Sequence, residues 1–508
     1  MHVRTKMSWT WSDDDVLRQT PQSERTQSRT RDSLATGQPA MQPAMAPVHV
    51  LVFPWPMQGH INSMLHLTAG LLGAGLHITF LHTDHNLRRV DRANAATSPR
   101  LRLMSVPDGL PDDHPRSVYD IKDLGRSLRT TGSVAYRALL ASLLVDDAAG
   151  FPKLSCVVAD GLLTFATDIA EALGVPALPF RTESACSLLA YLSVPRLVEL
   201  GEVPIPVGAE LDDAPVHGVP GMEGFLRRRD LPSSCRRHAE THDVDPMLQV
   251  FVSHTAHSFG ARALILNTAA SLERSALAHI APHMRDVFAI GPLHAISAAA
   301  MALPRTSLWR EDDGCMTWLD GHADRSVVYV SLGSLTVISL EQFTELLSGL
   351  VGAGYAFLWA LRPDMVGASP KEAVEAAGNG GKARIVDWAP QRDVLRHPAV
   401  GCFLTHAGWN STLEGVVEGV PLVCWPFFMD QQINSRFVGT VWGNGLDMKD
   451  VCERAVVERM VREAMESGEL RTSAQALAQQ VRRDVAEGGS STTEFHRLVS
   501  FIKQLSCS

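Results

Sequence analysis

Short apolar segments alternate with amphipathic segments along most of this chain, and no other feature limits its possible folds as strongly. One series of such segments begins near residue 48 and a second near residue 326. An apolar run of four to seven residues followed by a segment with helical spacing predicts a strand and then a helix. The predicted strands are His49–Phe53, His77–His82, Leu101–Val106, Leu154–Ala159, Ala263–Asn267, Ser326–Ser331, Phe357–Leu361, Arg384–Asp387, Val400–Thr405 and Pro421–Trp425. Repeated strand–helix units of this kind form a parallel sheet with helices on both faces.

The two series predict two separate domains. A chain of 508 residues is too long for one ordinary core and suits two domains of roughly 200–250 residues each. The segment 294–310 is rich in Ala, Pro and Ser and is predicted to be the linker between a first domain over 47–293 and a second over 311–485, with 486–508 closing the chain. We therefore expect an α/β protein of two doubly wound, Rossmann-like domains, whose strand ends face one cleft.

The first 46 residues differ from the rest of the chain. They are rich in Ser, Thr, Gln, Arg and Asp without periodicity, which predicts a disordered extension. A transit peptide is the alternative, although the acidic residues Asp13–Asp15 and Glu24 count against it. Met41 or Met45, just before the first strand, could be the true start.

Composition excludes several classes of function. The formal charge of −9 and pI near 6.1 lack the basic bias of a nucleic-acid binder. None of the eight cysteines forms a CxxC pair, and several lie in apolar runs, so buried free thiols are expected in a reducing compartment. Polar residues interrupt every apolar stretch before it reaches the length of a membrane span. We expect a soluble, cytoplasmic protein, and a monomer.

The most specific pattern is the segment Trp388–Gln431, which reads WAPQRDVLRHPAVGCFLTHAGWNSTLEGVVEGVPLVCWPFFMDQ. Its predicted strand Val400–Thr405 runs through a short turn into a helix. Gly408 in the turn allows the backbone to approach a ligand closely, and the first amides of the helix are unpaired donors at the positive end of its dipole. His406 can add a donor beside them. This arrangement suits a diphosphate.

Each residue of the segment also has a simpler interpretation. Ser411 and Glu414 are spaced as a capping box, in which the carboxylate only bonds the helix start. Trp388 alone would more often be a packing aromatic, and Asp430–Gln431 alone a solvated turn. What distinguishes the segment is that all of these residues occur together at fixed spacing.

The segment resembles the signature box of plant family-one UDP-glycosyltransferases, and it has the 44 positions of that box. Ala407 stands where Cys is commoner. The matching residues are Trp388, Pro390, Gln391, His397, Thr405, His406, Gly408, Trp409, Asn410, Ser411, Glu414, Gly419, Val420, Pro421, Pro426, Asp430 and Gln431. The resemblance extends over roughly 47–508 and implies a fold of the GT-B type.

The resemblance implies a role for each donor-site residue. Trp388 would stack on uracil while the backbone of Ala389 bonds the base edge. The ribose ligands would be Gln391 and Glu414, and the phosphate ligands His406, Asn410, Ser411 and Ser334. The sugar ligands would be Trp409, Asp430 and Gln431. In this family a final Gln accompanies glucose donors and a His accompanies galactose donors, so Gln431 favours UDP-glucose. No metal or other cofactor is implied.

Inverting glycosyl transfer needs a base that takes the acceptor proton. His60 follows the first strand, where the family has its catalytic His, and Ser63 stands in place of the usual Pro of GHxxP. A satisfied His near a helix start is the alternative for His60. Asp160 matches the family's second catalytic residue and would orient the imidazole, as in a Ser-His-Asp triad. Asp84 and Asp108 also follow strands and are the competing candidates.

The acceptor side is predicted less directly. The segments Pro107–Tyr119 and Thr182–Leu200 are expected to line the acceptor pocket, with Ser184, Leu188 and Tyr191 facing it. The phrases Ser155–Gly161 and Leu226–Pro232 resemble the branch of the family that glucosylates terpenoids and cyanohydrins. A small hydrophobic acceptor, such as a terpenoid, phenolic, cyanohydrin or hormone-like aglycone, is therefore expected.

Three functions remain in view at this point. The first is an inverting UDP-glucose glucosyltransferase. The second is an enzyme of the same fold with a different reaction, such as a glycosyl phosphorylase or a nucleotide-sugar epimerase, and the third is a non-catalytic nucleotide-sugar binder. The presence of both His60 and Asp160 beside a full donor box favours the first.

Overall fold

The structure is a computed structural model that describes residues 47–90, 98–117, 120–145, 150–208, 213–237, 243–296, 308–366, 381–449 and 451–506. The predicted disordered extension 1–46 and most of the predicted linker lie outside these ranges. The residues from Pro47 to Ser508 form one compact unit.

The first half of this unit is built on a seven-stranded parallel sheet in the order β3-β2-β1-β4-β5-β6-β7. The strands are β1 (His49–Phe53), β2 (His77–Thr83), β3 (Leu101–Val106), β4 (Leu154–Asp160), β5 (Ala177–Arg181), β6 (Leu264–Leu266) and β7 (Val287–Ala289). All five residues of β1 and of β5 are buried, as expected for central strands covered on both faces.

Ten helices accompany this sheet among the described residues. They are α1 (Gln58–Gly73), α2 (Asp84–Arg89), α3 (Ile121–Ser127), the π-helical turn η3 (Leu128–Gly132), α4 (Ser133–Leu143), α5 (Thr164–Ala172), α6 (Ala185–Glu199), α7 (Pro246–Phe259), α8 (Ala270–Ile280) and α9 (Leu293–Ile296). Three 3-10 turns, η4 (Arg228–Asp230), η5 (Ser233–Cys235) and η6 (Ala281–His283), complete this half.

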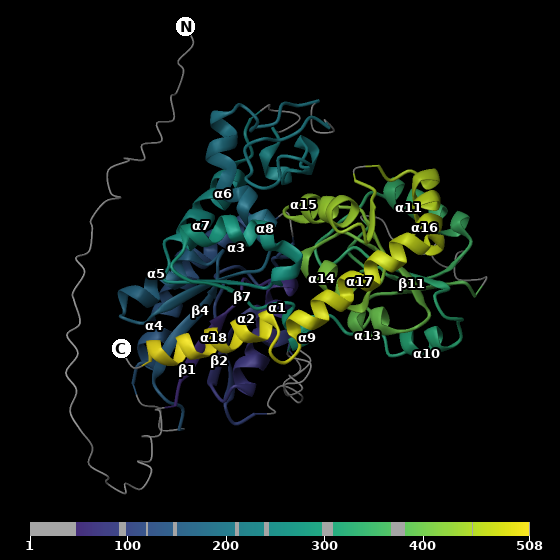
Figure 1. Ribbon diagram of the computed structural model, residues 1–508. Helices are drawn as coiled ribbons and strands as arrows, with labels where there is room; N and C mark the ends of the chain where they lie inside the picture. The colour runs from purple at the N-terminus through teal and green to yellow at the C-terminus, as the bar shows by residue number, and fades with distance from the viewer. Residues whose placement is uncertain are drawn as a thin grey trace, which may run out of the picture. The chain divides into compact units, whose positions relative to one another are not determined.

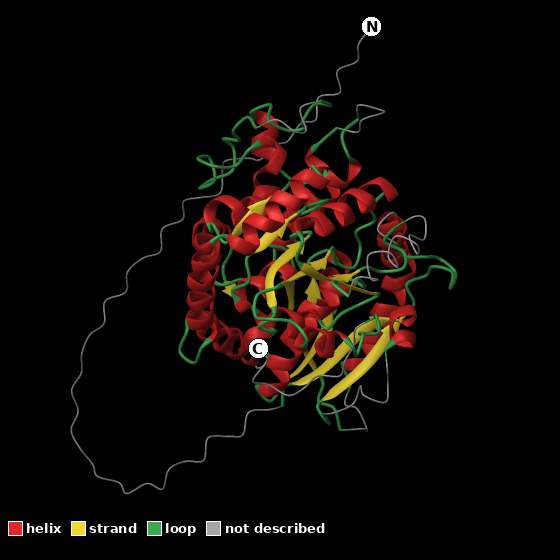
Figure 2. Ribbon diagram, turned by 90° about the vertical axis from the view of Figure 1, so that its right-hand side faces the viewer, coloured by secondary structure: helices red, strands yellow, loops and turns green. Residues whose placement is uncertain are grey.

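The second half repeats the plan with a six-stranded parallel sheet in the order β10-β9-β8-β11-β12-β13. Its strands are β8 (Val327–Ser331), β9 (Ala356–Ala360), β10 (Ala383–Val386), β11 (Val400–Thr405), β12 (Leu422–Cys424) and β13 (Gly445–Asp447). Its helices are α10 (Cys315–Asp320), α11 (Leu340–Ala353), α13 (Gln391–Arg396), α14 (Trp409–Glu418), α15 (Gln431–Arg436), the π-helical turn η8 (Phe437–Val441), α16 (Arg454–Glu466) and α17 (Gly468–Val485). Figure 2 shows helices around the strands of both sheets.

The last helix, α18 (Ser490–Leu505), lies against the first sheet and not the second. Phe495, Leu498, Val499 and Ile502 join the apolar cluster formed by β1, β2, β4 and α1. Figure 1 shows α17 and α18 running one after the other from the second half back to the first. The end of the chain therefore ties the two halves together through apolar packing.

Most of the predicted strands agree with the structure to within one residue at each end, and three strands were missed. The β5 strand contains Pro179, which weakens a strand pattern, but β6 pairs only with Phe180 and Arg181, so the missing N–H of Pro179 removes no ladder bond there. The strands β7 and β13 have three residues each, too short for a periodic signal.

Two further expectations concern the cysteines and the membrane. The described cysteines carry free thiols, and Cys156, Cys186, Cys235, Cys315, Cys402 and Cys424 are buried. Within the described ranges, no helix is both long and apolar enough to cross a membrane.

Candidate active site

The strand order fixes where a ligand can bind in each half. In both sheets the order reverses beside the first strand, between β1 and β4 and between β8 and β11. Segments that follow these four strands leave the sheet at its carboxyl edge, where the crevice of a doubly wound fold opens. They carry His60, Ser334 and His406, and Asp160 is the last residue of β4, so the topology alone brings these four side chains to the two crevices.

A cleft of about 1010 Å³ is lined by residues of both halves. Its first-half wall includes His60 and its second-half wall includes the whole predicted donor set. The predicted residues that line the cleft are His60, Tyr191, Ser334, Trp388, Ala389, Gln391, His406, Trp409, Asn410, Ser411, Glu414, Asp430 and Gln431.

His60 lies in the first turn of α1, and its ring is held by two contacts at Nδ1. Its Nδ1 is 2.7 Å from Oδ2 of Asp160 and 3.0 Å from Oγ1 of Thr182, so Nε2 is the ring nitrogen left for a substrate. Burial alone would lower the pKa of His60, but the charge and hydrogen bond of Asp160, with the charges of Glu183 and Asp430, outweigh it and raise the pKa. The imidazole is therefore a stronger base than an isolated histidine.

Asp160 is the last residue of β4 and is almost completely buried. Its Oδ1 accepts a hydrogen bond of 3.0 Å from the amide of Leu162. Burial raises the pKa of this carboxyl, yet His60 and the Leu162 amide together lower it, so Asp160 stays ionised. Of the competing candidates, Asp108 is bonded twice to Arg116, at 2.8 and 3.0 Å, and Asp84 begins α2. The structure places Asp160 against His60.

The anion site predicted in the second half is formed by the start of α14. Gly408 is the N-cap residue, so the first amides of the helix open into the cleft. The His406 ring lies between Gly333 and Gly408, and a Cβ at either glycine would collide with its Nε2. Burial and the charge of Arg362 lower the pKa of His406 to about 4. A neutral ring at this position can donate one hydrogen bond to a phosphate oxygen.

Arg362 supports the loop that carries Ser334. Its guanidinium is buried and donates to the carbonyl oxygens of Gly333, at 2.6 Å, and Thr336, at 3.0 Å. The two bonds hold the loop after β8 in place, and Ser334 of this loop lines the cleft. This arginine, which follows β9 by two residues, belongs to no sequence motif that would have predicted its role.

The predicted ribose ligands form one network. Nε2 of Gln391 donates to Oε2 of Glu414, at 2.7 Å, and to Oγ of Ser411, at 3.0 Å. Oε1 of Gln391 accepts from the hydroxyl of Tyr329, at 3.2 Å. The amide of Gln391 is thus used within the protein, and it orients Glu414, whose other oxygen remains for the ribose hydroxyls. Trp388, the predicted uracil platform, lies stacked on Trp309 with ring centroids 5.9 Å apart.

The side chain of Asn410 has two hydrogen-bond partners that the sequence did not indicate. Its Nδ2 donates to the carbonyl oxygen of Gly59, at 2.7 Å, and its Oδ1 accepts from Oγ of Ser63, at 2.8 Å. Both partners are on the His60 side of the cleft. The departure Ser63, which replaces the usual Pro, therefore contributes a hydrogen bond between the two halves. Asn410 links the start of α14 to the residue before His60.

The structure limits how Trp409 could act as a sugar ligand. Its indole Nε1 donates to the carbonyl oxygen of Asn267, at 2.8 Å, and the ring packs in an apolar cluster with Leu413 and Val416. The side chain therefore cannot donate to a sugar hydroxyl. Only the backbone of Trp409, at the first turn of α14, remains for the donor.

Asp430 and Gln431 stand at the start of α15 and line the cleft. Oε1 of Gln431 accepts from the amides of Phe427, at 2.8 Å, and Phe428, at 3.2 Å, which leaves its NH₂ group to donate. Asp430 accepts from Asn434 at 2.8 Å. Burial raises the pKa of Asp430 to about 7, against the hydrogen bond from Asn434 and with the charge of Glu183 adding to the effect. One acceptor and one donor thus lie side by side, as hydroxyl recognition requires.

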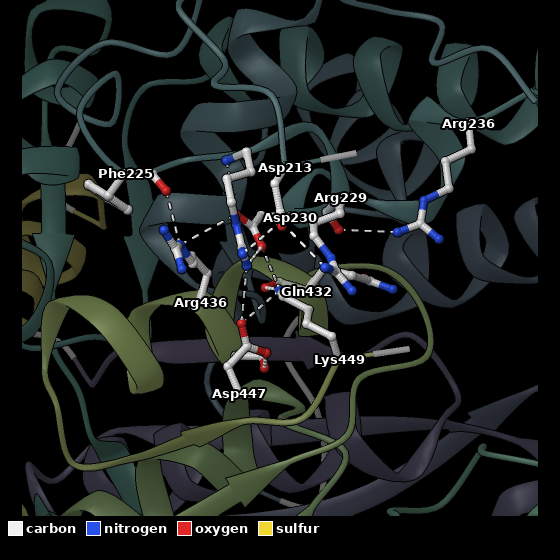
Figure 3. A network of polar contacts seen from close by, with 11 residues as sticks. Asp213, Phe225, Arg229, Asp230, Arg236, Gln432, Arg436, Asp447 and Lys449 are labelled. Atoms are coloured by element: carbon white, nitrogen blue, oxygen red, sulfur yellow. Dashed lines mark hydrogen bonds and ion pairs between the residues drawn. The ribbon is translucent and has the colours of Figure 1, made fainter. Parts of the chain in front are cut away.

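A buried ion-pair network holds α15 from the first half of the chain (Figure 3). Asp230 is fully buried and lies 2.7 Å from Nζ of Lys449 and 3.4 Å from Nε of Arg436. Within its own half, Arg227 donates to both oxygens of Asp230, at 3.0 and 2.9 Å. Lys449 also donates to the carbonyl oxygen of Gln432 in α15, at 2.8 Å. The segment Leu226–Pro232 therefore fixes the helix that carries Gln431.

Of the three residues predicted to face the acceptor pocket, one lines the cleft. Tyr191 lines the cleft, whereas Ser184 and Leu188 do not. Ser184 is the N-cap of α6, where its hydroxyl accepts from the amide of Ser187, and Leu188 is fully buried in the core beneath α6. One helical face meets the cleft, so neighbouring positions of the same helix turn inward. None of the described residues of the segment Pro107–Tyr119 lines the cleft.

Thr182 and Glu183 follow β5, belong to the predicted segment Thr182–Leu200 and line the cleft. Several other residues that line the cleft were missed. Lys122, Arg126 and Arg129 come from α3 and η3, and His254 comes from α7. Charged residues on an amphipathic helix ordinarily indicate a solvated face, so the sequence offered no signal that would separate these from surface charges.

Comparisons with known proteins agree with this geometry. The family described as UDP-glucoronosyl and UDP-glucosyl transferase matches residues 292–469. A 7-deoxyloganetic acid glucosyl transferase of Catharanthus roseus is 42% identical over 90% of this chain and 98% of its own length. A myricetin 3-O-rhamnoside 1,2-glucosyltransferase of Crocosmia x crocosmiiflora is 44% identical over 90% of this chain and 96% of its own.

Solved structures share the fold. Os79 from O. sativa in complex with UDP has a TM-score of 0.75 at 29% identity and covers 89% of this chain and 100% of its own. A UDP-glucose: anthocyanidin 3-O-glucosyltransferase in complex with UDP also has a TM-score of 0.75, at 25% identity, over 91% of this chain and 100% of its own. The predicted fold, two facing Rossmann-like domains of the GT-B type, is confirmed.

Proposed function

Because this chain belongs to the UDP-glycosyltransferase family, we propose that it transfers glucose from UDP-glucose to a hydroxyl of a small hydrophobic acceptor, with inversion and with His60 as the base. The observation that carries the proposal is the His60–Asp160 pair. Nε2 of His60, which this pairing leaves free, faces the same cleft as the start of α14 and the Asp430–Gln431 pair. A base, an anion site and a sugar site thus open into one space.

The second half would bind the donor along its length. Trp388 and the Ala389 backbone take the uracil, and Glu414, oriented by Gln391, takes the ribose hydroxyls. The amides of α14, with Ser411, Ser334 and neutral His406, take the diphosphate. Asp430 accepts from sugar hydroxyls and Gln431 donates to them.

The reaction follows from this placement. Nε2 of His60 takes the proton of the acceptor hydroxyl while the acceptor oxygen attacks the anomeric carbon of glucose. The bond from that carbon to the diphosphate breaks, and UDP leaves with the bonding pair. Asp160 stabilises the imidazolium that forms, and the α14 amides stabilise the charge on the leaving diphosphate. Attack opposite the leaving group inverts the anomeric carbon.

The two alternative functions fit less well, because neither needs a base beside an acceptor alcohol. A non-catalytic nucleotide-sugar binder has no use for an imidazole whose pKa a buried carboxylate raises. A phosphorylase or epimerase would use the donor site without an acceptor alcohol beside His60. The aromatic lining next to His60, with Trp55, Phe165 and Phe251, suits an organic acceptor.

We also propose that the protein works in the cytoplasm as a monomer and without a metal ion. The family resemblance supports each of these points. Among the described residues, His114, Asp120 and Asp123 could together hold a metal ion, but they lie outside the cleft lining. No nucleic acid is expected as a partner, given the net charge of −9.

The test is a transfer assay with the purified full chain. UDP-glucose is offered with a panel of terpenoid, phenolic and cyanohydrin alcohols, and glucosides are separated from free glucose by mass spectrometry. The expected result is a β-glucoside from at least one class, with UDP released in equal amount. If UDP-glucose binds but no alcohol of the panel is glucosylated, the proposed reaction is wrong.

A further inference from the structure

A row of cationic side chains lies along the acceptor side of the cleft. Lys122, Arg126 and Arg129 line the cleft from α3 and η3. Their spacing of four and then three residues places all three on one face of the helix. The same face carries Ile121 and Gly125, and a Cβ at Gly125 would lie 3.3 Å from the ring of Trp55, so it packs directly on the aromatic floor of the pocket.

These cations are weakly neutralised. Among the described residues, neither Lys122 nor Arg129 has an ion-pair partner. Arg126 lies 3.4 Å from Asp123, but both side chains are more than half exposed, and an exposed pair of this kind contributes little. The other carboxylate of the helix, Asp120, accepts from Ser117 and is not among the lining residues. The row keeps most of its positive charge.

The row lines the cleft, and its three side chains are also exposed to solvent. His254 lines the same cleft from α7, and its pKa is lowered to about 4 by burial first and then by the charges of Arg181 and Arg129. Arg129 therefore lies close enough to α7 to act electrostatically on His254. The ring of His254 is left neutral and able to donate a hydrogen bond.

Two carboxylates that line the cleft have other partners. Oε1 of Glu183 accepts from Nε of Arg181, at 2.8 Å, and Asp245 caps α7 by accepting from the amide of Met247, also at 2.8 Å. Neither forms an ion pair with Arg129 among the described residues. An anion entering this part of the cleft would thus meet a positive potential and a low-dielectric aromatic wall, which strengthens the attraction.

We propose that the acceptor carries an anionic group, most simply a carboxylate, in addition to the hydroxyl that receives glucose. Arg129 and Lys122 bind this group while the apolar body of the acceptor lies on Trp55, Phe165 and Phe251. Arginine suits a carboxylate because its planar guanidinium can donate two parallel hydrogen bonds. The diphosphate of the donor belongs to the other half of the cleft, at α14, so the two anions have separate sites. This inference rests on the proposed function and names its substrate class.

The experiment compares matched acceptors. A hydroxy acid and its methyl ester, drawn from the glucosylated members of the panel, are assayed with the full chain and UDP-glucose. The acid is expected to have a kcat/KM at least tenfold above that of the ester, and to lose this advantage as NaCl is added, since salt screens the attraction. In the double variant Lys122→Gln/Arg129→Gln the ratio should fall to about one, with the KM for UDP-glucose unchanged.

Two controls make the result specific. Arg137→Gln removes a charge from the exposed face of α4, outside the cleft lining, and should leave the acid-to-ester ratio as in the wild type. Binding of the acid to the UDP complex, followed by tryptophan fluorescence, gives a readout that does not depend on turnover. Loss of that binding in the double variant supports the inference.

Equal kcat/KM for acid and ester in the wild type, or an unchanged ratio in the double variant, would overturn it while leaving glucosyl transfer intact. Failure of the proposed function looks different, because no alcohol would then be glucosylated whatever its charge. In that case the fluorescence titration still decides between an anion-binding and a neutral pocket.

Discussion

Nδ1 of His60 lies 2.7 Å from Oδ2 of Asp160; His60 is in the helix that follows β1, and Asp160 ends the adjacent strand β4. The bond fixes the tautomer that leaves Nε2 free toward the cleft. It also explains why the pair appears at this point of the fold. β1 and β4 are the strands between which the sheet order reverses, so the segments after them meet at the crevice.

The first prediction concerns the base itself. His60→Ala is expected to lower kcat by about 10²–10⁴-fold, the usual contribution of general base catalysis, because no other described base faces the cleft at this place. UDP affinity should stay within about twofold, since the diphosphate site is on α14. Transfer rates with saturating UDP-glucose, and a UDP titration, check both parts. A variant that kept most of its activity would remove His60 from the mechanism.

The second prediction concerns pH. The base must be neutral to act and the pKa of His60 is raised, so kcat/KM should rise with pH through a midpoint above 6.5. Asp160→Asn removes the charge that raises this pKa and leaves burial, which lowers it. The midpoint should therefore move to lower pH, although the rate itself falls.

Asp430 supplies the control for this measurement. Its pKa of about 7 means that it also ionises in this range, and it too becomes active as pH rises. Asp430→Asn should remove that contribution and should also lower the His60 midpoint, by less than Asp160→Asn does, because the charge of Asp430 raises the pKa of His60 less than the charge of Asp160 does. If Asp160→Asn left the midpoint where it is in the wild type, the rise of kcat/KM with pH would be due to ionisation of Asp430 and not of His60.

Whether the sequence could predict a feature depends on how far apart along the chain the interacting residues lie. Local patterns were sufficient for the long apolar strands and for the box Trp388–Gln431, because spacing along one strand–turn–helix unit is itself the geometry of the site. They were insufficient where a partner lies far along the chain. Asn410 bonds Gly59 and Ser63 across the cleft, and the indole of Trp409 bonds Asn267, and neither contact has a local signature.

The same reasoning explains the acceptor side. Ser184 and Leu188 share a helix with Tyr191, and only the packing of α6 decides which of its faces meets the cleft. The contact of Thr182 with His60 has no local signature, because the two residues lie far apart along the chain. Lys122 and Arg129 have the sequence pattern of a solvated helical face. Only the tertiary structure, in which α7 also lines the cleft, makes this face part of the pocket wall.

A third prediction tests the uracil platform. Trp388→Leu should weaken UDP binding roughly tenfold or more, because base–aromatic stacking contributes about 1–3 kcal/mol per base. Trp388→Tyr keeps a stacking surface and should restore much of the affinity. Calorimetric titration with UDP measures both. Equal affinity in wild type and Trp388→Leu would assign the uracil to another surface.

A fourth prediction concerns metal ions. The amides of α14 and the neutral His406 are expected to support the leaving diphosphate by themselves, so excess EDTA should leave the initial rate within about twofold of its value without chelator. The assay is repeated after added Mg²⁺ as a control. A large loss of rate in EDTA that Mg²⁺ restores would contradict the proposal.

The last prediction concerns the contact between Asp230 and Lys449. Asp230→Asn would leave Lys449 and Arg436 buried with one negative charge fewer, and loss of one partner from a buried pair costs about 3–5 kcal/mol. The free energy of unfolding in urea should fall by an amount of this order. Asp213→Asn is the matched control, since Asp213 contacts the same Arg227 but is largely exposed, and its loss should cost less than about 1 kcal/mol.

The activity of the Asp230→Asn variant decides whether the network also positions the sugar site. Lys449 bonds the carbonyl oxygen of Gln432, the residue next to Gln431, so a loosened α15 should raise the KM for UDP-glucose more than the Kd for UDP, because the proposed UDP ligands are outside α15. A purely structural role would lower stability and leave the ratio of these two constants unchanged. Measurements at a temperature where the variant is folded separate the two effects, because only displacement of Gln431 acts on the glucose end of the donor while sparing its nucleotide end.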